Sequence, residues 1–588
     1  MASYRSGFGT AVTLAASLLT ALTANRAAAF DVTSHSPSKY ALGVAADAVI
    51  TVTFDAPVDP ATVTGGSVIV RGLMSGIHPA NLAVNGAVLT IDPQADFPVG
   101  EIVTINLTSA LKAMGGSSLT GGHSLQFTVR TGSGLLDFQE LGQWSTLPGQ
   151  TPYFIYGGDL DGNGTPDAAV PNEDSNNLSV FLNNGAGGLS QHSEFTTGSV
   201  PSSCYGDDLD QDGDLDVVTA NISSANMTVL LNGGNGTSFT STHYASGTTC
   251  RQVYGGDFDG DGDTDLVTTG FSNNTINLHF NLGNGAFLQP RTVIPTTSGP
   301  FPVFVGDMNL DGHPDFVVGF QGVPRQVQIF LNSGGGSFTA GPVLAVGSGA
   351  WDFFGNDLDG DGDLDLALVE ANTSRVRVLY GDGAGGFAST LTFLTGSFPL
   401  AVFTADLDGD GDHEIISSDF SGRDVRVFEN AGAGQFPLAE TLPTIQSGSY
   451  AWGHDMDGDS DLDLTVVDEL ADRIFVFRNL AEPAGVPPGT QSPPLSVRLL
   501  TPFPNPASRS TTIGYEAPPG AGRVTLRLYS VSGKLVRTLL DGPPPAKGRG
   551  DVLWDGRTAS GGRAPAGVYL VRLDGAAGTA ATRLHIIR

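Results

Sequence analysis

The sequence is poor in lysine, in cysteine and in charge of either sign. Of 588 residues, 15% are charged and two are cysteine, and the lysines number four: Lys39, Lys112, Lys534 and Lys547. So little charge excludes long solvated helices and coiled coils, which depend on Glu, Lys and Arg. The net charge of −32, with 60 acidic residues, excludes nucleic acid as a partner, because phosphate backbones require basic surfaces.

Long apolar runs are also missing. The N-terminal run from Ala11 to Leu22 is shorter than the ~20 residues that span a bilayer, and we therefore expect no transmembrane span. Arg5 precedes this run and the small residues Ala27–Ala29 follow it, a pattern typical of a signal peptide over residues 1–29. We therefore expect a secreted protein, in surroundings where calcium is plentiful.

Familiar catalytic motifs are absent from the sequence. It has no GxSxG elbow, HExxH helix, P-loop or CxxC pair, and its ten histidines do not recur at one position of a motif. We therefore expect no enzyme, no catalytic residue and no organic cofactor. The alternative is a polysaccharide-acting hydrolase or lyase whose site is built on a repeated scaffold.

What the sequence does have is an acidic string of nine residues that occurs seven times. The strings begin at Asp159, Asp208, Asp257, Asp307, Asp357, Asp406 and Asp455, at intervals of 49 or 50 residues. Each has an aromatic residue three positions before it, and two apolar runs, a glycine-rich turn and a further extended segment after it. Four short strands per repeat are typical of a propeller blade. The sequence thus predicts an all-β protein with a seven-bladed β-propeller over residues 133–481.

The two ends of the repeat region complement each other. After Asn479 the seventh repeat lacks its fourth strand, and a Pro/Gly linker follows over residues 482–496. A segment like a fourth strand occurs instead before the first string, at residues 135–146. We predict that this segment pairs with the blade that contains Asp455 and closes the ring, which would remove exposed sheet edges.

The acidic strings, numbered here as loops 1 to 7, have the composition of calcium loops. Positions 1, 3, 5 and 9 are carboxylates or amides, and position 6 is glycine in six of the seven, which allows a positive φ. Oxygen ligands without His or Cys suit a hard cation, and many carboxylates in a flexible loop favour Ca²⁺ over Mg²⁺. The loops hold 31 of the 60 acidic residues, more than solvated acidic turns would need for solubility.

We predict up to seven structural Ca²⁺ ions, weakest in loops 1 and 4, which have three carboxylates each. An EF-hand is excluded because position 12 is not Glu and strands flank each loop. The predicted ligands are Asp159, Asp161, Asn163 and Asp167; Asp208, Asp210, Asp212 and Asp216; Asp257, Asp259, Asp261 and Asp265; Asp307, Asn309, Asp311 and Asp315; Asp357, Asp359, Asp361 and Asp365; Asp406, Asp408, Asp410 and Glu414; and Asp455, Asp457, Asp459 and Asp463.

With their flanking strands, these strings resemble the FG-GAP/VCBS repeats of integrin α-like propellers, apart from departures at Asn163, Asn309, Glu414 and Ser460. The resemblance implies that the loops join the first and second strands of each blade on a lower face, and that ligands meet the upper face. The loops expected there vary between blades: 173–174, 321–325, 370–375, 419–424 and 468–473. We expect an adhesion or recognition module for a protein or glycan on the upper face; the alternative to binding is a purely structural envelope protein.

Two further modules flank the repeats. Residues 30–132 alternate between β-like runs and turns, as in a β-sandwich, and Ile50–Phe54 followed by Pro57–Pro60 resembles bacterial Ig-like domains. Residues 497–588 resemble the FlgD-related Ig-like module of type IX secretion cargo at Pro504–Pro506, Trp554–Gly556 and Gly567–Leu570. That resemblance implies export and attachment to the bacterial cell surface through secretion machinery. The alternative is simply another sandwich.

The two cysteines leave one question open. Cys204 and Cys250 lie four and seven residues before their strings, on inner strands of neighbouring blades. Secretion favours a disulfide. An offset of three residues, however, corresponds to about 10 Å along a strand, beyond the Cα separation of about 7 Å that a disulfide tolerates.

Overall fold

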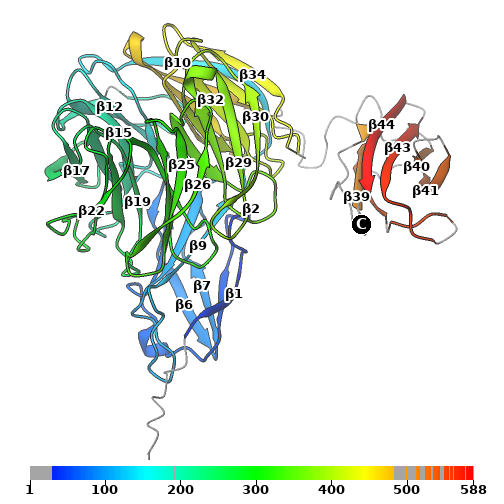
Figure 1. Cartoon of the computed structure of the whole chain (residues 1–588), viewed down its shortest axis with the longest axis horizontal. Helices are drawn as coiled ribbons and strands as arrows, with labels where there is room; N and C mark the ends of the chain where they lie inside the picture. Colours follow the sequence, from blue (N-terminus) through cyan, green and yellow to red (C-terminus); the bar gives the residue numbers. More distant parts are fainter. Residues whose placement is uncertain are drawn as a thin grey trace, which may run out of the picture.

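The computed structural model of the chain describes residues 30–190, 192–432 and 434–481, and towards the C-terminus residues 498–499, 511–516, 523–530, 534–542, 549–554, 556–559, 562–575 and 578–586 (Figure 1). The predicted signal peptide and linker lie outside these residues. The helical elements described are three short 3₁₀ turns, Pro60–Thr62, Ala371–Thr373 and Glu469–Ala471. Within the described part, no helix is long and apolar enough to cross a membrane.

The middle of the chain folds into four-stranded antiparallel sheets, one for each acidic string. Six of the sheets use four consecutive strands. These are β11 (Tyr156–Gly158), β12 (Asp167–Asn172), β13 (Asn177–Phe181) and β14 (Ser193–Thr196); β15 (Pro201–Asp207), β16 (Asp216–Asn221), β17 (Asn226–Asn232) and β18 (Phe239–Ala245); β19 (Cys250–Gly256), β20 (Asp265–Gly270), β21 (Thr275–His279) and β22 (Thr292–Pro295); β23 (Pro300–Gly306), β24 (Asp315–Phe320), β25 (Gln326–Asn332) and β26 (Phe338–Ala345); β27 (Asp352–Asn356), β28 (Asp365–Glu370), β29 (Arg375–Gly381) and β30 (Phe387–Leu394); and β31 (Pro399–Ala405), β32 (Glu414–Asp419), β33 (Asp424–Phe428) and β34 (Leu438–Pro443).

The seventh sheet closes the ring. It joins β35 (Tyr450–His454), β36 (Asp463–Asp468) and β37 (Arg473–Ala481) to β10 (Gly134–Ser145), which lies before the first string in the sequence. Strand β10 runs antiparallel to β37, with Trp144 opposite Ile474 and Phe138 opposite Asn479. The predicted pairing of this segment with the blade that contains Asp455 is therefore confirmed.

The first strands of the sheets surround a common axis. Strand β11 contacts β15, and the contacts continue through β19, β23, β27, β31 and β35, which returns to β11. The sheets therefore form a seven-bladed β-propeller, and each acidic loop connects the first strand of a blade to the second. We call the face with these loops the lower face and the opposite one the upper face.

A collar of aromatic rings fills the axis. The aromatic residues three positions before the loops pack side by side, with ring centroids 4.6–5.8 Å apart for six neighbouring pairs. The collar residues are Tyr156, Tyr205, Tyr254, Phe304, Phe354, Phe403 and Trp452. The collar therefore lines the axis between the lower mouth of the propeller and the upper mouth, with ring contacts between six of the seven neighbouring pairs.

The N-terminal region is a sandwich of two sheets. One sheet contains β1 (Val32–Ser36), β3 (Ile50–Phe54), β7 (Val88–Pro93) and β6 (Ala80–Asn85); the other contains β2 (Ala41–Val44), β9 (His123–Val129), β8 (Ile102–Leu107), β4 (Val68–Gly72) and β5 (Gly76–Ile77). Alternate residues of both sheets, such as Ile50, Leu89, Ile105 and Phe127, share one buried core. The predicted sandwich is thus present.

This N-terminal sandwich covers the lower face of the propeller (Figure 1). Its backbone exchanges hydrogen bonds with the acidic loops: Ser109 N–H donates to Gly260 O at 2.9 Å, Ser124 N–H donates to Gly312 O at 2.6 Å, and Asp159 N–H donates to Met74 O at 2.8 Å. The approach is close enough that a Cβ on Gly122 would lie 2.8 Å from the Gly260 Cα. The resemblance to known repeats did not predict this packing.

The C-terminal region forms a second sandwich in its described segments. One sheet contains β38 (Arg498–Leu499), β39 (Thr511–Glu516) and β42 (Arg549–Trp554), and the other contains β41 (Leu535–Gly542), β40 (Val524–Ser530), β43 (Gly567–Gly575) and β44 (Gly578–Ile586). Both sheets contribute to a core around the fully buried Trp554. Residues Pro504–Pro506 lie outside the described segments.

Both cysteines are buried free thiols. The Cys204 thiol points to Ala169 O at 3.7 Å, and the Cys250 sulfur lies 3.2 Å from the Ser246 hydroxyl. Burial raises the pKa of Cys250 to about 11. The question left open by the sequence is therefore answered against a disulfide.

Candidate metal sites in the acidic loops

Each acidic loop starts at the lower end of an inner strand, and its position 9 is the first residue of the second strand. Position 1 is held by backbone N–H groups of its own loop: in loop 3, the Asp257 carboxylate accepts from Gly260 at 2.8 Å and from Gly262 at 3.0 Å. The glycine at position 6 has φ between 85° and 100° in loops 1 to 6, as the sequence predicted. Ser460 adopts φ 79° at this position of loop 7, a conformation that costs a non-glycine residue energy.

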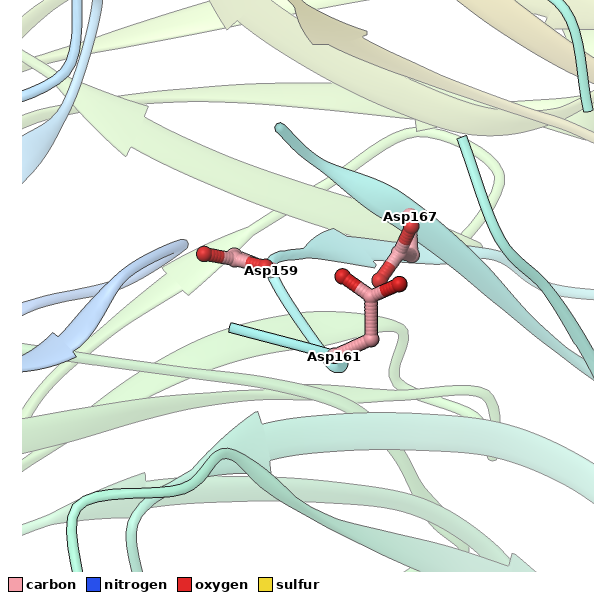
Figure 2. Close-up of side chains that lie close together, drawn as sticks. All are labelled: Asp159, Asp161 and Asp167. Carbon is pink, nitrogen blue, oxygen red and sulfur yellow. The ribbon is translucent and has the colours of Figure 1, made fainter. Parts of the chain in front are cut away.

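Carboxylates converge inside these loops. In at least five loops, oxygen atoms of three carboxylates lie within 4.8 Å of one another. Positions 1, 3 and 9 meet in loops 1, 2, 3 and 6, and positions 1, 3 and 5 meet in loop 5. Figure 2 shows the carboxylates of Asp161 and Asp167 turned toward each other with Asp159 beside them. All donors are oxygens, which suits a hard divalent cation such as Ca²⁺.

Position 5 lies at the edge of most of these clusters. Its carboxylate accepts the N–H of position 7, as in Asp212 with Asp214 at 3.0 Å and Asp363 N–H to Asp361 at 3.0 Å. In loop 1 the amide of Asn163 donates to Asn183 O at 3.2 Å. The sequence treated positions 1, 3, 5 and 9 as equal, whereas the structure brings 1, 3 and 9 together most often.

Position 9 joins the loop to its blade. One oxygen accepts the N–H of position 2, and the other accepts the N–H of a residue 16 or 17 positions further along the chain, at or near the end of the third strand. In loop 2 these donors are Leu209 at 2.9 Å and Asn232 at 2.7 Å from Asp216. The same pair of bonds recurs on Asp167, Asp265, Asp315, Asp365, Glu414 and Asp463.

Burial makes these carboxylates costly to ionise without a cation. Desolvation raises the pKa of Asp167 to about 7, and the pKa values of Asp216, Asp315, Asp365 and Asp463 to about 8, with backbone hydrogen bonds opposing the shift. Neighbouring carboxylates raise them further. A divalent cation in each loop would supply the missing positive charge, because opposite charge favours the ionised form.

An asparagine links six of the seven loops to the neighbouring blade. Asn232, at the end of β17, donates to Leu160 O of loop 1 at 2.7 Å and to Leu215 O of its own loop at 3.0 Å. Asn183, Asn281, Asn332, Asn430 and Asn479 each donate to position 2 of the preceding loop in the same way, and Gly381 replaces the asparagine in the fifth blade. This asparagine was not among the functional residues predicted from the sequence. Its recurrence 16 or 17 residues after position 9 was the available signal.

Comparison with known families identifies the repeat. A family model described as an FG-GAP-like repeat matches residues 159–219, 208–268, 257–318 and 357–417. The middle of the chain is an array of FG-GAP-like repeats. The matched segments contain loops 1 to 6, and loop 7 of the FG-GAP array lies beyond them.

The flanking regions match two further models. A bacterial Ig-like domain matches residues 26–129, and a FlgD Ig-like domain matches residues 506–578. The chain therefore carries an Ig-like domain on each side of its FG-GAP array.

The chain is similar to solved structures at low sequence identity. One, described as the structural basis of specific recognition of non-reducing terminal N-acetylglucosamine by a lectin of Agrocybe aegerita, has 19% identity and a TM-score of 0.37, covering 68% of this chain and 94% of that one. Another, a candidate 6-phosphogluconolactonase from Bacteroides uniformis, has 14% identity and a TM-score of 0.40, covering 65% and 97%. No curated protein matches the chain by sequence.

The N-terminal Ig-like domain brings two cations to the lower face of the FG-GAP array. The Arg71 guanidinium donates to Asp207 at 3.3 Å and to Gly262 O of loop 3 at 3.4 Å. The Lys39 ammonium pairs with Asp307 of loop 4. These side chains and part of the aromatic collar line a cavity of about 100 Å³, and the contacts of the domain with the loops cover the lower mouth.

The upper mouth of the FG-GAP array is lined by all seven blades. A small cavity of about 20 Å³ is surrounded by residues near the starts of the inner strands, including Tyr153, Ser203, Arg251, Phe301 and Trp351. The half-buried Trp351 ring packs 5.5 Å from Phe301, and its Nε1–H donates to the Tyr153 hydroxyl at 3.3 Å. The Arg251 guanidinium lies 5.0 Å from the centre of the Phe301 ring, a cation–π contact.

Charged and unpaired polar groups surround this aromatic cluster. Burial raises the pKa of Glu173 to about 7; the nearby Glu469 carboxylate raises it further, and the Arg251 guanidinium opposes the shift. In the part of the chain that the structure describes, the buried Ser203 Oγ and Arg251 Nε have no hydrogen-bond partner. The sequence singled out Glu173, but not the aromatic residues or Arg251.

Several other charges of the variable upper loops pair within the structure. Glu370 pairs with Arg377 at 2.8 Å, and Asp419 lies 3.6 Å from Arg426 of the same blade. Asp468 accepts backbone N–H groups of Ile445, Gln446 and Ser447 at 2.7–3.0 Å. These acids fix their loops, which leaves the cluster around Trp351 as the stronger candidate for recognition.

Proposed function

We propose that this chain is a secreted recognition protein of the bacterial cell surface, whose FG-GAP propeller holds calcium below and binds a protein or glycan ligand above. One observation carries the proposal. The N-terminal domain covers the lower face, while the opposite mouth combines aromatic rings with unpaired polar groups. The upper mouth is therefore the accessible end of the axis.

Calcium has a structural part in this proposal. The ion would be held by the oxygens at positions 1, 3 and 9 in most loops and at positions 1, 3 and 5 in loop 5, which are subsets of the four ligand positions predicted from the sequence. The bound ion supplies positive charge to buried carboxylates, which otherwise raise one another's pKa. Since each position 9 also fixes two strands of its blade, the ion would stiffen the scaffold that presents the upper mouth.

The chemistry of the upper mouth favours a glycan over a protein. Tryptophan and tyrosine rings such as Trp351 and Tyr153 combine an apolar face with a polar tip, and a sugar ring offers apolar C–H groups beside hydroxyls. Carboxylates and a guanidinium, as in Glu173 and Arg251, are strong hydrogen-bond partners for such hydroxyls.

The flanking modules support the proposed location. Ig-like and FlgD-like domains are typical of extracellular bacterial proteins, and both are present here. We propose that the C-terminal module connects the chain to the secretion and surface-attachment machinery, while the N-terminal one completes the lower face of the propeller.

A glycan array, with protein pull-down in parallel, tests recognition. We expect the wild-type chain to bind a defined glycan and Trp351→Ala to weaken binding at least about tenfold, as for a central aromatic contact. The control, Trp144→Ala on strand β10, should bind normally. Absence of any ligand would favour the structural envelope protein, and turnover of a glycan that Glu173→Gln abolishes would favour the hydrolase or lyase.

Calcium titration tests the scaffold. Addition of calcium to chelator-treated protein should raise its melting temperature, because the ion binds the folded loops and not the unfolded chain. Asp257→Asn, at position 1 of loop 3, should reduce the increase. A melting temperature that does not change at millimolar calcium would contradict the calcium sites.

A further inference from the structure

Loop 4 differs from the other acidic loops in the side chain that the N-terminal domain places against it. It has three carboxylates, Asp307, Asp311 and Asp315, and an amide, Asn309, at position 3. Loop 1 also has three carboxylates, so the number of acidic groups alone does not set loop 4 apart. What sets it apart is a lysine from the N-terminal domain.

The Lys39 ammonium forms an ion pair with the Asp307 carboxylate. The two side chains are 10% and 4% exposed, so the pair is nearly shielded from water. Its neighbour Tyr40 fixes the approach: the hydroxyl of Tyr40 donates to Asp307 O at 3.1 Å and accepts the Asp307 N–H at 2.8 Å. The lysine is therefore held at position 1 of the loop.

The remaining polar groups of loop 4 satisfy each other. Asn309 donates from its amide to Asp311 Oδ2 at 3.0 Å, and Gly312 N–H donates to Asp307 at 2.6 Å. Across the described residues, no other position 1 carboxylate forms an ion pair with a lysine or arginine. Arg71 acts on Asp208 and Asp257 only from a longer distance, since its ion pair is with Asp207. Asp457, at position 3 of loop 7, lies 3.5 Å from Arg478, but that arginine is 36% exposed.

We propose that the Lys39 ammonium takes the place of the divalent ion at loop 4, so that the chain binds six calcium ions rather than seven. The inference rests on the proposed calcium sites in the other loops. Two cations that share the Asp307 carboxylate would repel each other at short range. The lysine is covalently part of the chain and its burial is already offset by its partner, so it wins that competition.

This arrangement gives the N-terminal domain a chemical role in the propeller. Its docking supplies the positive charge that loop 4 needs, and this charge cannot be removed by a chelator. The fourth blade would therefore keep its loop conformation at calcium concentrations that empty the other loops.

The test is the number of calcium ions per chain, measured by equilibrium dialysis and elemental analysis of the full-length protein in millimolar calcium. We expect six for the wild type and seven for Lys39→Met, which removes the ammonium and keeps the apolar stem. Asp307→Asn should still bind six, whereas Asp159→Asn in loop 1 should bind five. Arg71→Met, which removes the other buried cation of the interface, should remain at six.

Seven ions in the wild type, a loss of one ion in Asp307→Asn, or an unchanged six in folded Lys39→Met would each overturn the inference while leaving calcium binding intact. Because Asp307→Asn keeps Lys39 in place, it decides the question even if Lys39→Met fails to fold. A wild-type chain without any bound calcium would instead overturn the proposed function, and this inference with it.

Discussion

Buried carboxyl groups differ in their surroundings along this chain, and the surroundings decide what keeps each one stable. At position 9 of the acidic loops, as in Asp216 and Asp463, the carboxylate lies among other acids, where a metal ion would offset its charge. Glu101, in the N-terminal domain, has no such neighbours. It accepts hydrogen bonds from the Met74 N–H at 2.8 Å and from the Ser75 hydroxyl at 2.6 Å.

Glu101 predicts a pH dependence of stability. Burial raises its pKa to about 7, so the folded chain holds a proton there that the unfolded chain releases near its ordinary pKa. The protonated Glu101 therefore contributes to the free energy of unfolding at low pH, and this contribution is lost as the pH rises through 7. Glu101→Gln should match the wild type near pH 5 and be more stable near pH 8, by on the order of 3 kcal/mol.

Denaturant unfolding at both pH values measures this difference. The control is Glu194→Gln. Glu194 is an exposed residue of strand β14 that pairs with His192, and its substitution should change the free energy of unfolding little at either pH. A Glu101→Gln chain that is less stable than the wild type at pH 8 would contradict the assignment.

The convergence of the loop carboxylates was predictable from the sequence because their spacing repeats. Positions 1, 3 and 9 are set by one local turn, and Gly262 shows the positive φ that the motif requires. The side chains around Trp351 were not predictable, because each blade contributes a different residue to the upper mouth. These residues are not related to one another by a repeating interval in the sequence.

At the scale of elements, the blades are held together by asparagine side chains as well as by their apolar cores. Asn281, two residues beyond the third strand of the third blade, donates to Leu209 O of the preceding loop at 2.8 Å and to Thr264 O at 3.2 Å. Its own oxygen accepts the Leu282 N–H at 2.8 Å. One side chain thereby joins two blades and a turn.

Asn281→Ala should destabilise the propeller by about 1–3 kcal/mol, because buried carbonyl groups lose their donor. Chemical denaturation in calcium measures the change. The exposed Asn284 in the following turn, whose oxygen accepts the Ala286 N–H at 3.2 Å, supplies the control: Asn284→Ala should cost less. Equal losses in the two variants would show that the link between blades contributes nothing of its own.

The strands next to the acidic loops were predictable, and some strands of the N-terminal sandwich were not. Strands such as β16 follow the loops as apolar runs, whose residues are all buried. Strand β1 has a mixed sequence, VTSHS, and no buried residue, and β6 alternates half-buried and exposed positions. Their conformation comes from pairing with β3 and β7, which a local pattern does not reveal.

At the scale of the whole molecule, closure of the ring depends on one tight backbone approach. A Cβ on Gly134, at the start of β10, would lie 2.1 Å from the Asn479 side chain and 2.3 Å from Leu407 O. Both groups are fixed, since Asn479 is buried and bonded to that same carbonyl at 2.7 Å. The first residue of the closing strand therefore has to be glycine.

Gly134→Ala should destabilise the folded chain by about 1–3 kcal/mol, the usual cost of overpacking. A comparable Gly65→Ala substitution meets no atom within 4 Å and should be close to neutral. Thermal unfolding of both variants measures the contrast. An unchanged melting temperature in Gly134→Ala would mean that the seam between β10 and β37 adapts more easily than its geometry indicates.

The packing of the N-terminal domain on the propeller was beyond the reach of the sequence. Lys39 and Asp307 are 268 residues apart, and no sequence motif that contains one of them predicts a contact with the other. Ring closure could be predicted because one missing strand and one surplus strand complement each other. The contact between the domains depends on surface shape, which composition and period do not encode.

The seam between β10 and β37 also determines how the molecule would transmit mechanical load. Strand β37 ends at Ala481 on the lower side, opposite the mouth where we place the ligand, and it lies between β36 and β10 in the sheet. Tension between a captured ligand and a tether beyond Ala481 would act along the length of this strand. Its hydrogen bonds to both neighbours would then bear the force together, in shear, rather than being peeled apart one by one.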